Sequence, residues 1–230
     1  MSTTVTALTL AGLDKLPSHA RRCVFWEIDP AVAADSHQFA DPVFEKEAWL
    51  SKVMLDWGSC GQVVLIDNYP AGCAIYAPPG AVPRAGLFPT SPVSADAILL
   101  TALRLEPLSS LTAEDLGNRL VQAVVADLVR RGVRALEAFG IRPQPTTVTS
   151  TPSATAAMDC SPDTCMIASD FLEDVGFEVV APHHRFPRLR LELDSDHGWK
   201  EDVEYALEQL LSAAQLTMTP IVQSAKVGAC

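Results

Sequence analysis

The hydrophobic positions of the chain recur at two spacings, and each spacing predicts a different kind of element. Apolar residues three or four positions apart predict helices over residues 42–57, 113–131, 169–175 and 199–211. Short runs rich in β-branched and aromatic residues predict strands over residues 21–28, 61–67, 73–77, 97–105, 133–139, 177–180 and 186–193. The chain is therefore expected to mix helices with strands.

The stretch from 97 to 139 predicts how the middle of the sheet is connected. Residues 97–105 (AILLTALRL) form a nearly continuous apolar run, which is typical of a strand buried on both faces. An amphipathic helix and a second apolar strand, 133–139, follow this run. Such a strand–helix–strand unit places its two strands parallel with a right-handed crossover, so one parallel pair is expected.

The region before this unit predicts antiparallel pairing. Residues 61–67 and 73–77 are separated by the turn-forming sequence NYPAG at 68–72, and this order predicts a hairpin. The fold class is therefore α/β (α+β), with antiparallel strands around a parallel pair and with helices on the faces of the sheet.

Loop-forming composition divides the chain into one domain and flanking segments. Residues 78–94 are rich in proline and glycine and predict a long surface loop, while 143–164 are rich in threonine, serine and proline. The predicted organisation is a loose lead-in over 1–20, one domain over 21–195 with a flexible insertion over 143–164, a C-terminal helix over 196–214 and a tail over 215–230.

Composition and charge restrict the partners of the chain. Its 230 residues are 48% hydrophobic and carry a formal net charge of −11. An acidic surface repels phosphate backbones and anionic lipid, so no nucleic acid and no membrane partner is expected. No apolar run reaches the roughly 20 residues of a membrane span, and the first residues lack the basic region of a signal peptide. A cytoplasmic protein is therefore expected.

Six cysteines are scattered along the chain, as is typical of reduced thiols in the cytosol. Cys160 and Cys165 form a C-x4-C pair, but a zinc site would need two further ligands. The adjacent histidines His183 and His184 are the candidates for these ligands, although neighbouring histidines seldom bind one ion together. The prediction is free thiols and no metal site.

Three segments, in their order, resemble the GNAT N-acetyltransferase superfamily. They are the hairpin VVLIDNYPAGCAIYAPP (63–79), the strand–helix–strand unit ILLTALRLEP and LGNRLVQAVVADLVRRGVRALEAFG (98–107 and 116–140), and the late helix with its Gly-Phe strand, SDFLEDVGFEVV (169–180). The run PHHRFPRLRLEL (182–193) is similar to the closing strand of a bacterial subgroup. The resemblance covers residues 21–195.

This resemblance implies a mixed, mostly antiparallel sheet whose central parallel strands splay apart around acetyl-CoA. It implies direct transfer of the acetyl group to an amine acceptor, and also a possible homodimer or protein partner. The cofactor-binding residues that it implies are Leu103, Arg104 and Leu105 for the pantetheine arm and Gly117, Asn118 and Arg119 for the phosphates.

The phosphate-binding loop departs from the pattern of the family, which is Arg or Gln, two residues, Gly, one residue, then Gly or Ala. Here Thr112 and Asp115 stand at the first two of these positions, and only Gly117 matches. From the residues alone, Thr112 is a good helix N-cap, and Glu114 and Asp115 complement the positive end of the helix. Two carboxylates are thus expected where phosphates would bind.

The residue for general acid–base chemistry is not defined by the sequence. The family often carries a tyrosine four residues before the glycine of Gly-Phe, and this position is Leu172 here. The remaining catalytic candidates are Glu106, Tyr76 and Glu137, and a histidine of the pair His183–His184 could also accept a proton from an amine.

Two hypotheses therefore stand side by side. In the first, the chain is an N-acetyltransferase that uses acetyl-CoA. In the second, it is a catalytically degenerate member of the same fold that serves as a binding module, with 143–164 and 199–211 as contact surfaces. The altered residues Thr112, Glu114, Asp115 and Leu172 favour the second hypothesis, and the order of the elements is compatible with both.

Overall fold

The computed structural model describes residues 2–33, 41–106, 113–143 and 160–193. All of these residues belong to one compact unit, Met1–Leu193. Its strands are β1 (Thr3–Ala7), β2 (Gly61–Ile66), β3 (Tyr69–Ala77), β4 (Ala97–Leu105), β5 (Ala135–Ile141), β6 (Ile167–Ala168), β7 (Glu178–Ala181) and β8 (Arg188–Glu192). Its α-helices are α1 (Ser18–Arg22), α2 (Pro30–Ala33), α3 (Pro42–Asp56), α4 (Ala113–Arg130), α5 (Pro162–Cys165) and α6 (Ser169–Asp174).

The strands form one mixed sheet in the order β1-β2-β3-β4-β5-β8-β7, and β6 pairs with β5 outside this path. Strand β5 is parallel to β4 and to β6, whereas the other pairs are antiparallel. The predicted fold class, a mixed sheet with a central parallel pair, is confirmed. The crossover through α4 between β4 and β5 is confirmed as well.

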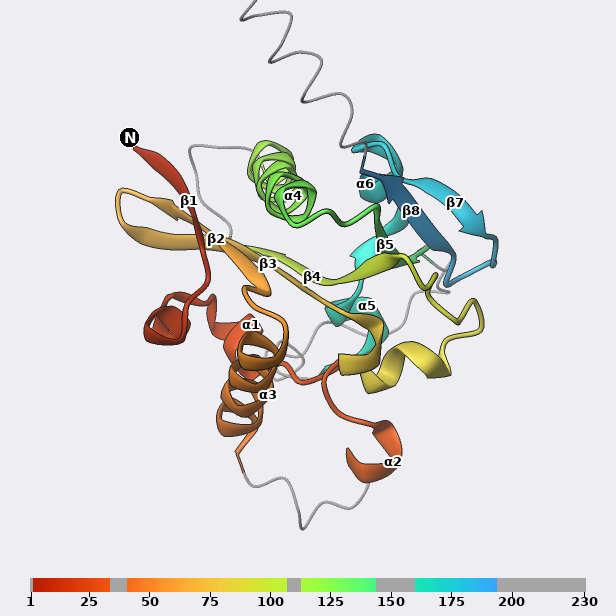
Figure 1. Cartoon of the computed structure of the whole chain (residues 1–230), viewed down its shortest axis with the longest axis horizontal. Coiled ribbons are helices and arrows are strands. Elements are labelled where there is room, and N and C mark those ends of the chain that lie inside the picture. Colours follow the sequence, from red (N-terminus) through yellow and green to blue (C-terminus); the bar gives the residue numbers. More distant parts are fainter. Residues whose placement is uncertain (1, 34–40, 107–112, 144–159, 194–230) are drawn as a thin grey trace, which may run out of the picture. The chain divides into compact units, whose positions relative to one another are not determined.

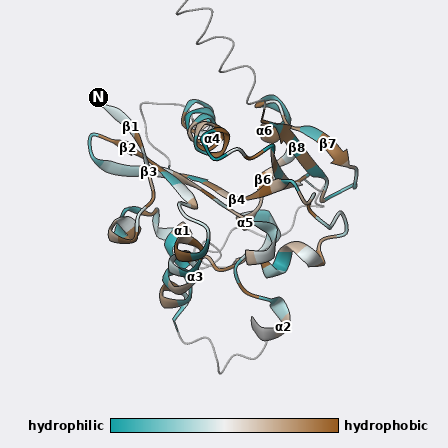
Figure 2. Cartoon of the chain, viewed as in Figure 1, coloured by the Kyte–Doolittle hydropathy of each residue, from teal (hydrophilic) through white to brown (hydrophobic). Residues whose placement is uncertain are grey.

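Helices cover both faces of the sheet (Figure 1). Helices α4 and α6 lie on one face, where the buried residues of α4 and Leu172 of α6 join a hydrophobic core with Tyr76 and Leu100. Helices α1, α3 and α5 lie on the other face, where Leu50 and Cys165 belong to a second core. Helix α4 carries hydrophilic and hydrophobic residues along its whole length (Figure 2), and its buried residues recur three or four positions apart, as expected for a helix with one buried stripe.

Three predicted helices are confirmed, and each ends one residue before its predicted end. They are α3, α4 and α6, and the side chain of Asp41 caps α3 by accepting a hydrogen bond from the Val43 N–H at 2.9 Å. The predicted helix at 199–211, the tail at 215–230 and most of the insertion at 143–164 lie outside the described residues. Among the helices that the structure describes, none has the length and hydrophobicity of a membrane span.

The predictions for the first 28 residues are wrong in two respects. Residues 1–20 are not a loose lead-in, because β1 pairs along its whole length with the edge of β2. Residues 21–28 are not a strand: Arg21 and Arg22 end α1, and the apolar residues after them enter the core individually. Trp26 stacks on Phe88 and Phe139, with ring centroids 5.0 and 5.8 Å away. An apolar run without clear periodicity is compatible both with such packing and with a strand, so the sequence of 21–28 did not distinguish the two.

The hairpin between β2 and β3 is tighter than predicted. Its turn consists of Asp67 and Asn68 alone, both with positive φ values of 47° and 71°. A two-residue turn of this kind matches the twist of the two strands, so β3 begins at Tyr69 rather than at residue 73. Pro70 is accommodated next to a bulge, where the register shifts opposite Val64 and Leu65.

Candidate functional site

The parallel strands β4 and β5 are paired over only a short distance. Their ladder joins Ala97–Leu99 to Ala135–Glu137, although β4 continues to Leu105 and β5 continues to Ile141. Beyond this ladder β4 remains paired with β3, and β5 remains paired with β6 and β8. The two strands therefore separate in the middle of the sheet. Strand β6 takes the edge of β5 at Gly140–Ile141, and the edge of β4 beyond Leu99 faces the gap.

A bulge in β4 lies where the two strands begin to separate. Ile75 of β3 is opposite Ala102, but the next residue, Tyr76, is opposite Leu100, so Thr101 is an extra residue in β4. The Thr101 hydroxyl donates a hydrogen bond to the Ile75 carbonyl at 3.0 Å. Because an extra residue falls outside the regular ladder and bends the strand, this bulge turns the second half of β4 away from β5.

Beyond the bulge, alternate residues of β4 face opposite sides of the sheet. Leu103 and Leu105 pack against the core under α4. Arg104 is paired across the strands with Cys73, a residue of the core on the α3 side, so Arg104 points to that side. Glu106 follows two residues later and is half-buried on the same side as Arg104. The end of β4 thus has an apolar face and a charged face.

Two buried polar atoms beside the gap have no hydrogen-bond partner among the described residues. They are Nη2 of Arg104 on β4 and Oδ1 of Asn118 on the first turns of α4. Buried polar groups are nearly always paired, and an unpaired one indicates a bound water, ion or ligand. Asn118 also lines a cavity of about 360 Å³ between α4 and α6, together with Val121, Gln122, Asp174, Val175 and Gly176.

The first turn of α4 is closely packed and acidic. A Cβ atom on Gly117 would lie 2.8 Å from the ring of Phe171, so α6 contacts the α4 backbone directly at this point. Glu114 and Asp115 are exposed on the same turn, as the sequence predicts. Arg119 is exposed as well, whereas Thr112, the predicted N-cap, lies outside the described residues. The only cationic candidate for phosphate binding therefore faces solvent.

Tyr76, one of the three catalytic candidates, belongs to a buried network under α4. Its hydroxyl donates to Oδ2 of Asp127 at 2.8 Å and accepts from Nε2 of Gln62 at 3.1 Å. Asp127 also accepts a hydrogen bond from Arg131 at 3.2 Å. Burial raises the pKa of Tyr76 far above its ordinary value. A hydroxyl in this position holds α4 to the sheet and is poorly suited to accept a proton.

Replacing Tyr76 by phenylalanine is expected to destabilise the fold by about 1–3 kcal/mol, because Asp127 and Gln62 lose a buried partner. The measurement is urea unfolding followed by circular dichroism. Tyr69→Phe is the matched control, since Tyr69 is 76% exposed and its hydroxyl lies at the surface. Equal stabilities of the two variants would show that the Tyr76 hydroxyl does not stabilise the fold.

Glu137, the second candidate, is fully buried and is held by two arginines. Its Oε1 accepts a hydrogen bond from Arg190 at 3.3 Å, and its Oε2 accepts one from Arg188. The backbone N–H of Ser94 donates to the same carboxylate at 3.2 Å. Glu137 therefore connects β5, β8 and the loop before β4. Of the three candidates, Glu106 alone lies at the end of β4 beside the gap.

Neither histidine of the pair His183–His184 is positioned at the gap. Nδ1 of His183 accepts hydrogen bonds from the backbone N–H groups of Arg185 and Phe186, at 3.2 and 2.9 Å. The two imidazole rings lie with their centroids 4.2 Å apart. His183 thus organises the turn before β8, as expected for a structural pair rather than a general base.

A second hollow, of about 500 Å³, lies on the α3 side and is lined by Glu27, Trp49, Lys52, Val53, Asp56, Trp57, Pro78, Gly80, Ala81 and Pro83. Within it the Trp49 indole donates a hydrogen bond to the Ala81 carbonyl at 2.7 Å. Glu27 forms a buried ion pair with Lys46 of α3. Burial raises the pKa of Glu27, and the nearby Lys46 ammonium opposes this shift. This ion pair was not predicted from the sequence.

No family model matches the sequence, and no curated protein matches it either. Two solved structures match with a TM-score of 0.50. One is the PaiA N-acetyltransferase of Thermoplasma acidophilum in complex with coenzyme A, at 12% identity over 84% of this chain and 99% of that chain. The other is the yncA protein of Salmonella typhimurium, described as an acetyltransferase and solved with acetyl-CoA, at 12% identity over 84% of this chain and 95% of that one.

The mixed sheet, its separating parallel pair and its helical crossover form the α/β fold that matches these two structures. The chain has the fold of the GNAT N-acetyltransferase superfamily, as its sequence predicted. At 12% identity this likeness concerns the fold alone.

Proposed function

We propose that the chain binds acetyl-CoA in the gap between β4 and β5 and transfers its acetyl group to an amine. The observation that carries this proposal is the early separation of the two strands at the Thr101 bulge, which leaves backbone groups along Leu103–Leu105 free of pairing with β5. The unpaired buried atoms of Arg104 and Asn118 support a polar ligand beside the same gap. Solved proteins of this fold contain coenzyme A or acetyl-CoA.

The residues fit the two parts of such a ligand differently. The backbone of Leu103, Arg104 and Leu105 would hold an amide-containing arm, since an exposed strand edge pairs with extended amides. The N-terminus of α4 would hold the phosphates, because helix N-termini offer N–H groups and a positive dipole end. Gly117 and Asn118 lie directly after this first turn. Glu114 and Asp115 oppose these phosphates by charge repulsion.

Bound acetyl-CoA would supply an acetyl group activated as a thioester. Glu106 is the residue that we assign to accept the proton of the attacking amine, through its carboxylate. Its place at the end of β4 on the charged face supports this role, whereas the carboxylate of Glu137 and the hydroxyl of Tyr76 are used in buried networks. Arg104 offers an unused N–H donor on the same face, which would help to bind the acceptor.

The competing function is a GNAT-fold binding module without turnover. Three observations favour it: the two carboxylates on the first turn of α4, the ring of Phe171 against Gly117, and the apolar Leu172 buried at the position of the tyrosine of the family. In this case the cleft between α4 and α6 would be closed to nucleotides.

Calorimetric titration with acetyl-CoA at low salt separates these functions. We compare the wild type with the double variant Glu114→Gln/Asp115→Asn, in which the shape of the helix end is kept and two negative charges are removed. Removing each repulsive charge gains about 1 kcal/mol or more, so the variant is expected to bind acetyl-CoA on the order of tenfold tighter or better.

The control for total charge is Glu47→Gln/Asp56→Asn on α3, which makes the same charge change on the other face of the sheet (Figure 1). Binding by the wild type leads to a screen of amine acceptors, with Glu106→Gln as the variant expected to bind acetyl-CoA without transferring the acetyl group. If neither the wild type nor the variant at α4 binds, acetyl-CoA is not a ligand, and the binding-module hypothesis remains.

A further inference from the structure

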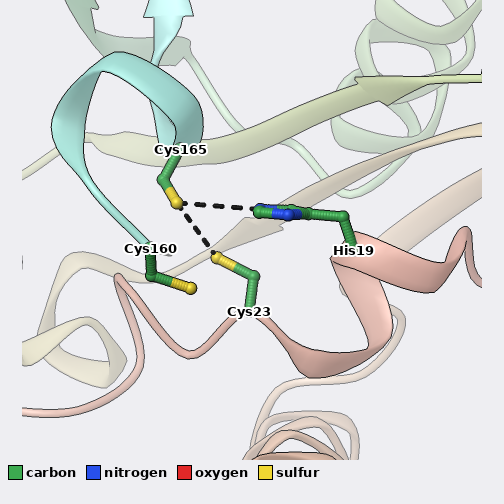
Figure 3. A group of neighbouring side chains, drawn as sticks. All are labelled: His19, Cys23, Cys160 and Cys165. Atoms are coloured by element: carbon green, nitrogen blue, oxygen red, sulfur yellow. Dashed lines mark hydrogen bonds between the residues drawn. The ribbon is translucent and has the colours of Figure 1, made fainter. Parts of the chain in front are cut away.

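Four side chains with metal-binding atoms meet on the α3 side of the sheet. His19 lies in α1, and Cys23 is the residue that ends this helix. Cys160 precedes α5, and Cys165 is its last residue. The four side chains point toward one another from these two segments (Figure 3). His19 and Cys23 are four positions apart, which places them on one side of a helical turn.

The distances within this cluster suit a tetrahedral zinc ion. The four ligand atoms all lie within 4.8 Å of one another. Sγ of Cys165 lies 3.4 Å from Sγ of Cys23 and 3.7 Å from Nε2 of His19. Zinc–sulfur bonds of about 2.3 Å at tetrahedral angles place two sulfur ligands about 3.8 Å apart. Small side-chain shifts would therefore bring all four atoms to bonding distance of one ion.

The local structure fixes these side chains in place. Cys23 and Cys165 are 9% and 2% exposed, so two ligands are anchored in the core. Ser161 and Thr164 form a capping box around α5 that sets the path of the chain from Cys160 to Cys165. Cys60 and Cys73 lie in the same core outside the cluster, where burial raises the pKa of each thiol to about 12.

A positive side chain accompanies the cluster. Three thiolates and one neutral imidazole around Zn²⁺ carry one net negative charge. Arg84 contacts Phe25, which follows the ligand Cys23 by two residues. Arg84 is held in place by donating a hydrogen bond to the Phe25 carbonyl and by stacking 4.1 Å above the Phe25 ring. It would balance the charge of the complex.

From this geometry we propose that His19, Cys23, Cys160 and Cys165 bind one Zn²⁺ ion in a closed structural site. All four tetrahedral positions are filled by protein atoms, which is typical of structural zinc and leaves no position for a substrate. The ion joins two segments 142 residues apart and thereby anchors α5 and β6 against α1. Because β6 pairs with the separated end of β5, the metal would hold one wall of the gap in place.

The alternative is a disulfide between Cys23 and Cys165, which requires a two-electron oxidant. A disulfide would leave Cys160 and His19 without a role, whereas zinc uses all four side chains. For this reason the metal accounts for more of the observed arrangement.

The proposal is tested on the untagged full chain, expressed with zinc and purified under reducing conditions without chelator. Elemental analysis is expected to give close to one zinc per chain for the wild type and for Cys60→Ala. It is expected to give little zinc for Cys160→Ser, which changes an exposed residue and is compatible with folding. Replacing zinc by Co²⁺ is expected to produce the intense visible bands of a tetrahedral thiolate site in the wild type and in Cys60→Ala, but not in Cys160→Ser.

Three outcomes would overturn the proposal. The first is wild-type protein that is folded and reduced but contains no zinc and shows no tetrahedral cobalt spectrum. The second is equal zinc content in the wild type and Cys160→Ser, which would place the metal elsewhere. The third is a Cys23–Cys165 disulfide found by mass spectrometry in protein purified without reductant from zinc-supplied cells. The titration with acetyl-CoA is independent of all three, since it measures a different site.

Discussion

Replacing Glu137 by alanine is expected to lower the free energy of unfolding by about 3–5 kcal/mol, because it removes the carboxylate paired with Arg188 and the buried one of the three carboxylates around Arg190. These arginines are 13% and 15% exposed, so water replaces the lost carboxylate poorly. Arg188 also donates to the Thr90 carbonyl at 2.8 Å, and the loop before β4 is expected to loosen with it. Urea unfolding measures the loss.

Asp96→Ala is the matched control for this prediction. Asp96 pairs with Arg190 at 2.9 Å but lies at the surface, where an ion pair contributes little to stability. Its replacement should leave the unfolding midpoint almost unchanged. A Glu137→Ala protein as stable as the Asp96→Ala protein would mean that the buried pair is not required for the fold. A Glu137→Gln protein of normal stability but without acetyl transfer would restore Glu137 as a catalytic residue.

Replacing Lys46 by methionine is expected to cost about 3–5 kcal/mol at neutral pH, because the carboxylate of Glu27 then remains in the core without its partner. The two side chains are 3% and 2% exposed. In the double variant Lys46→Met/Glu27→Leu no charge remains buried, so most of the lost stability should return. A double variant as unstable as Lys46→Met would contradict this account.

The loss in Lys46→Met should depend on pH in a defined direction. Burial raises the pKa of Glu27, and removing Lys46 removes the charge that opposes the shift. The folded state then retains a proton that the unfolded state has already released, so stability falls as pH rises from the ordinary glutamate pKa to the raised one. Unfolding curves measured from pH 4 to pH 7 should show the variant closest to the wild type at the acidic end.

Periodicity predicted the long elements of this fold well, but it could not predict those that depend on distant partners. Helices α3 and α4 follow from their stripes of apolar residues, and β4 follows from its apolar run. Strands β1 and β6 are five and two residues long, and each is defined by pairing with a strand far away in sequence. Such short segments carry too little pattern of their own.

In the candidate site as well, local features could be predicted from the sequence, whereas contacts with distant residues could not. The gap between β4 and β5 was expected from the resemblance to a known fold, and its acidic helix end could be read directly from Glu114 and Asp115. The buried partners of Tyr76 and Glu137 lie about fifty positions away, so the sequence could not show that both groups are already paired. The pair Cys160–Cys165 was recognised, but free thiols were predicted and only His183–His184 were considered as further ligands, so the neighbours His19 and Cys23 were missed. The helical spacing of His19 and Cys23 is the signal that could have identified them.

The pairing of β1 with β2 has a consequence for the behaviour of the protein in concentrated solution. Strand β2 (GQVVLI) is buried throughout and combines β-branched residues with the absence of charge, a composition that favours intermolecular β-sheet. Strand β1 covers its free edge with five residues, three of them threonines. The new outer edge is short and polar, so it is a poor template for another chain. Strand β1 is therefore expected to protect β2 from pairing with a strand of another chain.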